Sequence, residues 1–80
     1  MKCEEAIRFG RVVRQLRKEQ GLTQEKLAEL SDLDTTYISM IERAARIPTI
    51  RTLFALARAL HVSASSLISA TEEEIGSEKR

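Results

Sequence analysis

The sequence is poor in the residues that form covalent cross-links or bind metals. Its 80 residues include one cysteine, one histidine and one proline, with no tryptophan. A single cysteine, Cys3, excludes a disulfide within the chain. Together with one histidine, His61, it leaves no ligand cluster at a useful spacing. We therefore expect no structural metal and no cofactor.

Long apolar runs are also missing. No stretch approaches the roughly 18 residues of a membrane span, and residues 1–10 are charged, without the apolar core of a signal peptide. A cytoplasmic protein with no membrane partner is expected. The composition, 42% hydrophobic and 31% charged, is that of one small globular domain. Such a domain buries only about 60% of its unfolded surface, which makes self-association helpful.

The net charge of +1 hides an uneven distribution. Residues 1–20 and 35–60 are each predominantly basic, whereas residues 21–34 and the last ten residues are predominantly acidic. Two basic segments could form one positive face for a polyanion. The alternative is a set of solvated helix surfaces, and charge alone does not separate the two interpretations.

Apolar residues recur at the three- and four-residue spacing of helices, without long strand-like alternation. Gly21 is expected to end the first helix, and four polar residues are N-cap candidates: Thr23, Asp34, Thr49 and Ser63. We predict an all-α, compact five-helix fold with helices over residues 4–20, 23–31, 35–44, 49–60 and 63–69. Residues 1–69 would form the domain, and 70–80 an acidic tail that is frayed or disordered.

The third expected helix carries an unusual outward face. At 100° per residue, four side chains lie opposite its core direction: Thr36, Ser39, Met40 and Arg43. A purely solvated face would more often carry glutamate and lysine. Short polar side chains let a helix enter the major groove of DNA and contact base edges or thymine methyl groups. Neutral surface residues remain the alternative.

Two short helices separated by a short turn, the second with this face, form a helix-turn-helix. The motifs L-T-Q-E-x-L-A (residues 22–28) and Y-I-S-x-I-E-R (residues 37–43) are specific. The stretch from Gly21 to Pro48 resembles the phage-repressor and Cro-like, or XRE, family. With its flanks the resemblance covers roughly Phe9 to Ile68. It implies a lambda-repressor-like domain, and the short length is similar to controller proteins of restriction-modification systems.

The resemblance implies roles for particular residues. Base reading falls to Thr35, Thr36, Ser39 and Met40. Contact with the DNA backbone falls to Gln24, Tyr37, Arg43 and Arg46, with Gln24 also bracing the third helix. The family also pairs an arginine of the first helix with the glutamate of the second motif, here Arg17 and Glu42. Glu42 lies on the flank of the core face, where an unpaired carboxylate would be costly.

Some positions depart from the family pattern. Thr35 stands where arginine or glutamine is common, and it cannot make their bidentate base contacts. Met40 stands where glycine is frequent, and Ala44 with Ala45 replaces a glycine after the third helix. Sequence recognition would therefore depend on thymine methyl groups, single hydrogen bonds and DNA shape.

One such unit makes few DNA contacts, and relatives bind as twofold dimers to half-sites about one helical turn apart. We expect a homodimer on a pseudo-palindromic operator. The candidates for its interface are Phe54, Val62, Leu67 and Ile68. The alternative is that these four residues complete the core of the monomer.

The leading hypothesis is a DNA-binding transcriptional regulator, such as a repressor, that binds double-stranded DNA and itself. The alternative is an antitoxin that neutralises a toxin and regulates its own operon, for which the acidic tail is the candidate partner-binding segment. An enzyme is not expected, because His61, Cys3 and the scattered carboxylates form no nucleophile or acid–base set. No residues are left for a ligand-binding domain, so no small-molecule ligand is expected.

Overall fold

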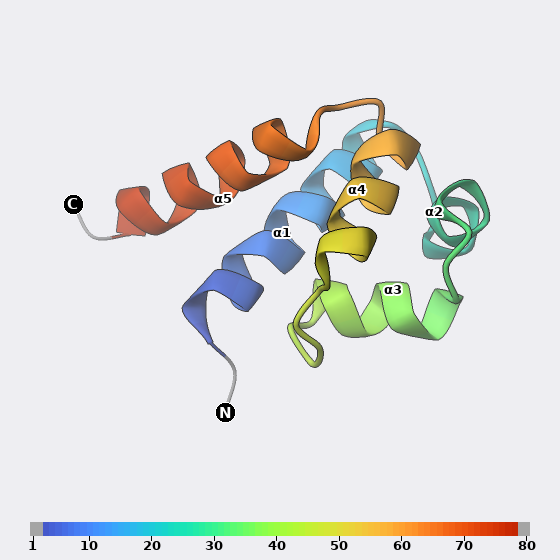
Figure 1. Ribbon diagram of the computed structural model, residues 1–80, viewed down its shortest axis with the longest axis horizontal. Coiled ribbons are helices and arrows are strands. Elements are labelled where there is room, and N and C mark those ends of the chain that lie inside the picture. The colour runs from blue at the N-terminus through green and yellow to red at the C-terminus, as the bar shows by residue number, and fades with distance from the viewer. Residues whose placement is uncertain (1–2, 79–80) are drawn as a thin grey trace.

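Five helices make up the structure, a computed structural model that describes residues 3–78 (Figure 1). They are α1 (Glu4–Glu19), α2 (Gln24–Ser31), α3 (Thr35–Glu42), α4 (Ile50–Ala59) and α5 (Ala64–Glu78). No strand occurs between residues 3 and 78. The predicted all-α, five-helix fold is therefore confirmed.

Helix α1 lies at the centre of the arrangement and packs against both α5 and α3. Helix α5 runs back along α1, while α2 packs against α3 and α4 (Figure 1). Helix α3 therefore lies at one edge of the bundle, with one side against its neighbours and the other outside. This position matters for function, because a helix at an edge can meet a partner along its length.

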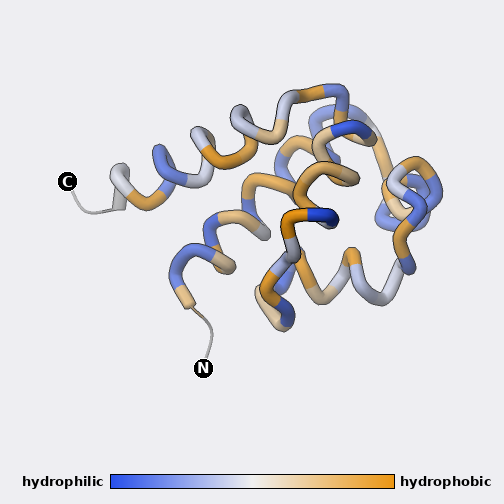
Figure 2. Tube along the Cα trace, in the orientation of Figure 1, coloured by the Kyte–Doolittle hydropathy of each residue, from blue (hydrophilic) through white to orange (hydrophobic). Residues whose placement is uncertain are grey.

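The core forms where all five helices meet. Its largest fully buried side chains are Val13, Leu27, Ile38, Ile41, Leu56, Leu60 and Leu67. The hydrophobic stretches of α1 and α4 in Figure 2 converge in this interior. Burial of each aliphatic side chain contributes about 1.5–3 kcal/mol, so this cluster supplies most of the drive to fold.

Four helices begin at the polar residues predicted as N-caps. The side-chain oxygens of Thr23, Asp34 and Thr49 each accept a hydrogen bond from a backbone N–H in the first turn. Ser63 does the same for the N–H of Ser66 at 3.0 Å. Each cap satisfies a donor that the helix itself leaves unpaired.

The third helix ends two residues earlier than predicted. It stops at Glu42, and Ala44 has a φ of 59°, a left-handed conformation that breaks a right-handed helix. The N–H of Ala45 donates to the carbonyl oxygen of Met40 at 2.7 Å and so closes the helix end. No glycine stands in this turn to mark the end of the helix, so the prediction placed that end two residues too late.

The fifth helix is longer than predicted. The expectation of a frayed or disordered tail from residue 70 is wrong through Glu78, because α5 continues to that residue. Thr71 is buried and donates its hydroxyl hydrogen to the carbonyl oxygen of Leu67 at 2.8 Å, and Ile75 is half-buried. With Leu67 they repeat every four residues and extend one face of α5. The end of the expected tail, residues 79–80, lies outside the described residues.

Candidate nucleic-acid interface

Helices α2 and α3 are joined by a three-residue turn, 32–34. Asp32 ends α2 with a φ of 57°, and the carboxylate of Asp34 accepts the N–H of Thr36 at 2.8 Å to start α3. Because α2 also packs on α4 and α3 on α1, the bundle fixes both helices. The pair is a helix-turn-helix whose second helix faces outward.

The outward face of α3 carries short or flexible side chains. Of the residues expected to read bases, Thr36 is exposed, and the others are half-buried: Thr35, Ser39 and Met40. The first turn of α3 is neither strongly hydrophilic nor strongly hydrophobic (Figure 2). A helix with such a face fits the major groove, which is about 12 Å wide.

Two arginines follow this face at the C-terminal end of α3. Arg43 caps the helix and Arg46 lies in the turn before α4, and both are exposed. The Nε of Arg43 donates to Ser39 Oγ at 3.3 Å, so Arg43 lies along the outer face of α3. Exposed guanidinium groups beside a groove-sized helix suit the phosphate backbone of DNA, which dominates the affinity of such interfaces.

A buried carboxylate joins α3 to α1 and α2. The side chain of Glu42 is 4% exposed and that of Arg17 10%. Arg17 donates from Nε to Oε2 at 2.7 Å and from Nη2 to Oε1 at 3.0 Å. Gln24 Nε2 donates to the same Oε1 at 3.0 Å. The hydrogen bond with Glu42 raises the pKa of Arg17 above its usual value.

This network gives Gln24 the bracing role that the resemblance implies. Its amide binds Glu42 of α3, so Gln24 braces the outward helix from the first turn of α2. Arg17 reaches the same region, since its Nη1 donates to the carbonyl oxygen of Leu22 at 2.8 Å. Contact between Gln24 and the DNA backbone stays a prediction.

A glycine of α1 provides a second attachment for α3, one that the sequence analysis missed. A Cβ at Gly10 would lie 2.5 Å from the carbonyl oxygen of Ile41 and 2.8 Å from that of Glu42. Both oxygens belong to the backbone, so neither can rotate away. A glycine inside an amphipathic helix is itself a signal of close packing, because it otherwise weakens the helix.

Tyr37, expected at the DNA backbone, is half-buried between α3 and α4. Its hydroxyl oxygen lies 3.1 Å from the Oγ1 of Thr52, a buried residue of α4. The ring also packs against the core. These contacts fix the ring of Tyr37 against the core and hold its hydroxyl group at the start of α4.

The four residues expected at a dimer interface have different environments. Phe54 and Ile68 are 53% and 44% exposed. Val62 is partly buried against the core. Leu67 is wrong as an interface residue, because the face of α5 that packs into the bundle buries it completely. For Leu67, completion of the monomer core is the correct interpretation.

Two further isoleucines extend the exposed apolar surface. Ile47 and Ile50 are 71% and 72% exposed, and they border an apolar cavity of about 340 Å³ that Ile68 also lines. The three- and four-residue spacing of apolar side chains in α4 predicts a buried stripe that begins at Ile50, but this residue opens the helix and is exposed. We call Ile47, Ile50, Phe54 and Ile68 the apolar patch.

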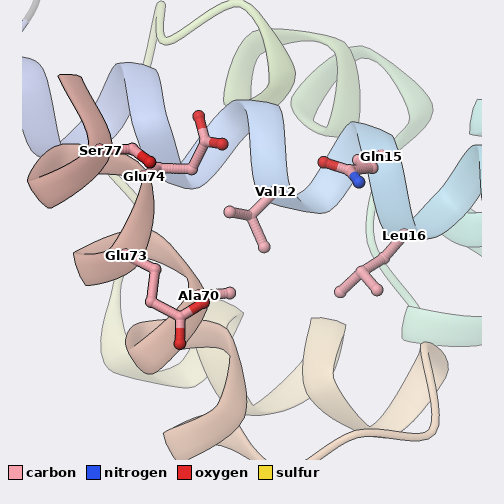
Figure 3. A pocket seen from close by; sticks show the side chains of 7 residues that line it. All are labelled: Val12, Gln15, Leu16, Ala70, Glu73, Glu74 and Ser77. Atoms are coloured by element: carbon pink, nitrogen blue, oxygen red, sulfur yellow. The ribbon is translucent and has the colours of Figure 1, made fainter.

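A second cavity, of about 320 Å³, lies between α1 and α5 (Figure 3). Its lining residues are Val12, Gln15, Leu16, Ala70, Glu73, Glu74 and Ser77. The lining thus combines two carboxylates, a hydroxyl and an amide with three apolar side chains. Across residues 3–78, no cluster of three or more His, Cys, Asp or Glu side chains could hold a metal ion.

In the described part of the chain no single helix is both long and apolar enough to cross a membrane. Among the described helices, α4 and α5 have the length and hydropathy of a span only when they are taken together, and the two helices are bent by 101° at their junction.

Comparison with known proteins gives a consistent result. Residues 13–67 match the family model described as helix-turn-helix. The uncharacterized HTH-type transcriptional regulator y4dJ of Sinorhizobium fredii is 47% identical over 58 residues, which cover 72% of this chain and 75% of that protein. The control protein C.MunI of a Mycoplasma species is 41% identical over 69 residues, 85% and 93% of the two chains.

A similar fold occurs in a solved structure. The restriction-modification controller protein C.Esp1396I superimposes with a TM-score of 0.82 at 39% identity, over 89% of this chain and 92% of that one. The match covers nearly all of both chains, so the resemblance includes the helices around the helix-turn-helix as well as the motif.

Proposed function

Since the chain belongs to the helix-turn-helix family of DNA-binding transcriptional regulators, we propose that α3 enters the major groove of a DNA operator and reads its sequence. Thr35, Thr36, Ser39 and Met40 would contact base edges. Gln24, Tyr37, Arg43 and Arg46 would contact the backbone. The single observation that carries this proposal is the outward face of α3, which is free of bulky charged side chains until Arg43.

We propose further that the protein binds as a homodimer, with one α3 in each half-site of a pseudo-palindromic operator. Twofold symmetry in the protein then matches twofold symmetry in the DNA. The apolar patch supports this proposal, because clustered exposed isoleucine and phenylalanine side chains are typical of surfaces that a partner covers. Neither a cofactor nor a small-molecule ligand is needed for this activity, and no catalytic function is proposed.

The relatives suggest the regulated system. C.MunI is named a control protein, and C.Esp1396I a restriction-modification controller protein. We propose the same role for this chain. The acidic segment that the antitoxin alternative needs as a partner-binding tail belongs, through Glu78, to α5, a helix that packs on α1.

Selection of bound duplexes from random-sequence DNA tests the function directly. We expect one enriched half-site motif, present twice with twofold symmetry, and a dimeric mass for the complex by native mass spectrometry. Absence of any enriched sequence, or a monomer bound to the selected duplex, would contradict the respective part of the proposal.

Two kinds of variant separate the roles of the surface residues. Arg43→Ala should weaken binding to all sequences alike and reduce the slope of log K against log salt by about 0.9 per subunit. Thr36→Ala should instead relax the preference at particular base pairs. Arg58→Ala is a matched control, because Arg58 is exposed in the last turn of α4, at the end away from α3 (Figure 1). An Arg58→Ala loss equal to that of Arg43→Ala would indicate general charge attraction.

A further inference from the structure

Three hydroxyl groups form a hydrogen-bonded chain from the start of α4 to Tyr37 on α3. Thr49, the N-cap of α4, accepts the backbone N–H of Thr52 at 3.1 Å and donates its own hydrogen to Thr52 Oγ1 at 3.1 Å. Thr52 Oγ1 in turn lies 3.1 Å from the Tyr37 hydroxyl oxygen, with either atom able to donate. The cap of one helix is thus connected to a side chain of another.

The direction of the last hydrogen bond follows from the first two. Each hydroxyl has one hydrogen to donate and two lone pairs to accept. One lone pair of Thr49 Oγ1 accepts a backbone N–H, and the hydroxyl hydrogen of Thr49 goes to Thr52. Thr52 is buried, and a buried hydroxyl hydrogen is seldom left without an acceptor. Among the contacts of the described residues, the Tyr37 oxygen is the acceptor that remains for it.

We infer that Thr52 positions Tyr37 as a hydrogen-bond donor to a DNA phosphate. If the Thr52 hydrogen is on the Tyr37 oxygen, then the Tyr37 hydrogen is free for an acceptor outside the protein. A phosphate oxygen is such an acceptor, and hydroxyl side chains often bind it. The inference rests on the proposed function, which places Tyr37 at the DNA backbone. Thr52 acts through Tyr37, so it is a positioning residue.

The arrangement also strengthens the donor. In a chain of hydroxyls that all point the same way, each hydrogen bond polarises the next, so the last group donates more strongly. The contact with phosphate is made without a charge. Losing it should therefore lower affinity but leave the salt dependence unchanged, because that dependence reflects counterions released by charged groups. This separates the role of Tyr37 from that of Arg43.

A double-mutant cycle on Thr52 and Tyr37 tests the inference. The probes are random-sequence duplex DNA and the duplex pool selected by the unmodified protein. Tyr37→Phe and Thr52→Val should each weaken binding about threefold to tenfold per subunit, the range of one neutral hydrogen bond. The double variant should be no weaker than Tyr37→Phe alone, with the salt slope unchanged in all three. Thr52→Ser, which keeps the hydroxyl, should restore the affinity.

Thr71→Val is the matched control for the loss of a buried hydroxyl. Thr71 is a buried threonine on α5 whose hydroxyl also makes one hydrogen bond. Its variant should lower the melting temperature without changing DNA affinity. If Thr71→Val weakens DNA binding as much as Thr52→Val, then the effect reflects stability alone and the inference is overturned.

The remaining outcomes separate this inference from the proposed function. Thr52 has no positioning role if Tyr37→Phe weakens DNA binding but Thr52→Val does not. The same follows if the two fold-losses in affinity multiply in the double variant. In both cases the proposed function stands. If the unmodified protein binds neither probe, then both the function and the inference are wrong.

Discussion

Replacement of Arg17 by methionine should test the attachment of α3 to α1 most severely. Methionine keeps much of the length of the arginine stem but has no donor. It removes the two hydrogen bonds to Glu42, at 2.7 and 3.0 Å, and the one to the Leu22 carbonyl oxygen at 2.8 Å. The Glu42 carboxylate, 4% exposed, would keep one recorded partner, the amide of Gln24.

The burial of the pair determines the size of the effect. An exposed ion pair contributes less than about 1 kcal/mol, whereas removing one partner of a buried pair costs about 3–5 kcal/mol because a charge is left without compensation. Domains have a total stability of about 0.05–0.15 kcal/mol per residue, which is about 4–12 kcal/mol for a chain of this length. The variant should therefore lose a large part of its stability and be partly unfolded at moderate temperature.

Urea unfolding followed by circular dichroism measures this loss. The double variant Arg17→Met/Glu42→Leu is the control, and it should recover much of the stability because no buried charge remains. The raised pKa of Arg17 means that its contribution is fully present below the unfolded pKa of arginine and is lost only as pH rises through the still higher folded value. The loss should thus be equal at about pH 7 and about pH 9. A loss below about 1 kcal/mol would refute the buried-pair argument.

Two substitutions, one in α1 and one just after α4, should change stability through the backbone. Gly10→Ala should destabilise the fold by about 1–3 kcal/mol, since its Cβ would press on the carbonyl oxygens of Ile41 and Glu42; unchanged urea unfolding would contradict this. His61→Gly should stabilise it by about 1 kcal/mol, because His61 is exposed with a φ of 59°, a conformation that costs other residues more than glycine. A lower melting temperature for His61→Gly would show that its side chain makes a contribution larger than this strain.

Features that act within a few residues could be predicted from the sequence. The caps at Thr23, Asp34 and Thr49 and the left-handed Gly21 all mark helix boundaries correctly. These signals are local, because a side-chain oxygen satisfies an N–H two or three residues away whatever the rest of the fold does. The number and order of the helices followed from them.

Features that depend on contacts between distant residues could not be predicted in the same way. Thr71 is polar, and only its burial makes it part of the bundle, so the length of α5 was missed. Ile50 fits an apolar stripe but has no neighbour to cover it. The contact between Tyr37 and Thr52 joins two helices, and no motif or spacing indicates it.

The attachments of α3 imply whether the protein or the DNA changes shape when the two bind. Glu42 and Gly10 fix its last turn to α1, and Tyr37 fixes its first half to α4. A helix held in this way is a rigid template, so little conformational entropy is lost when it binds. Any adjustment needed for a close fit then falls on the duplex, and the energy of deforming a duplex depends on its base sequence. Such a protein would discriminate among operators even at base pairs that none of its side chains touches.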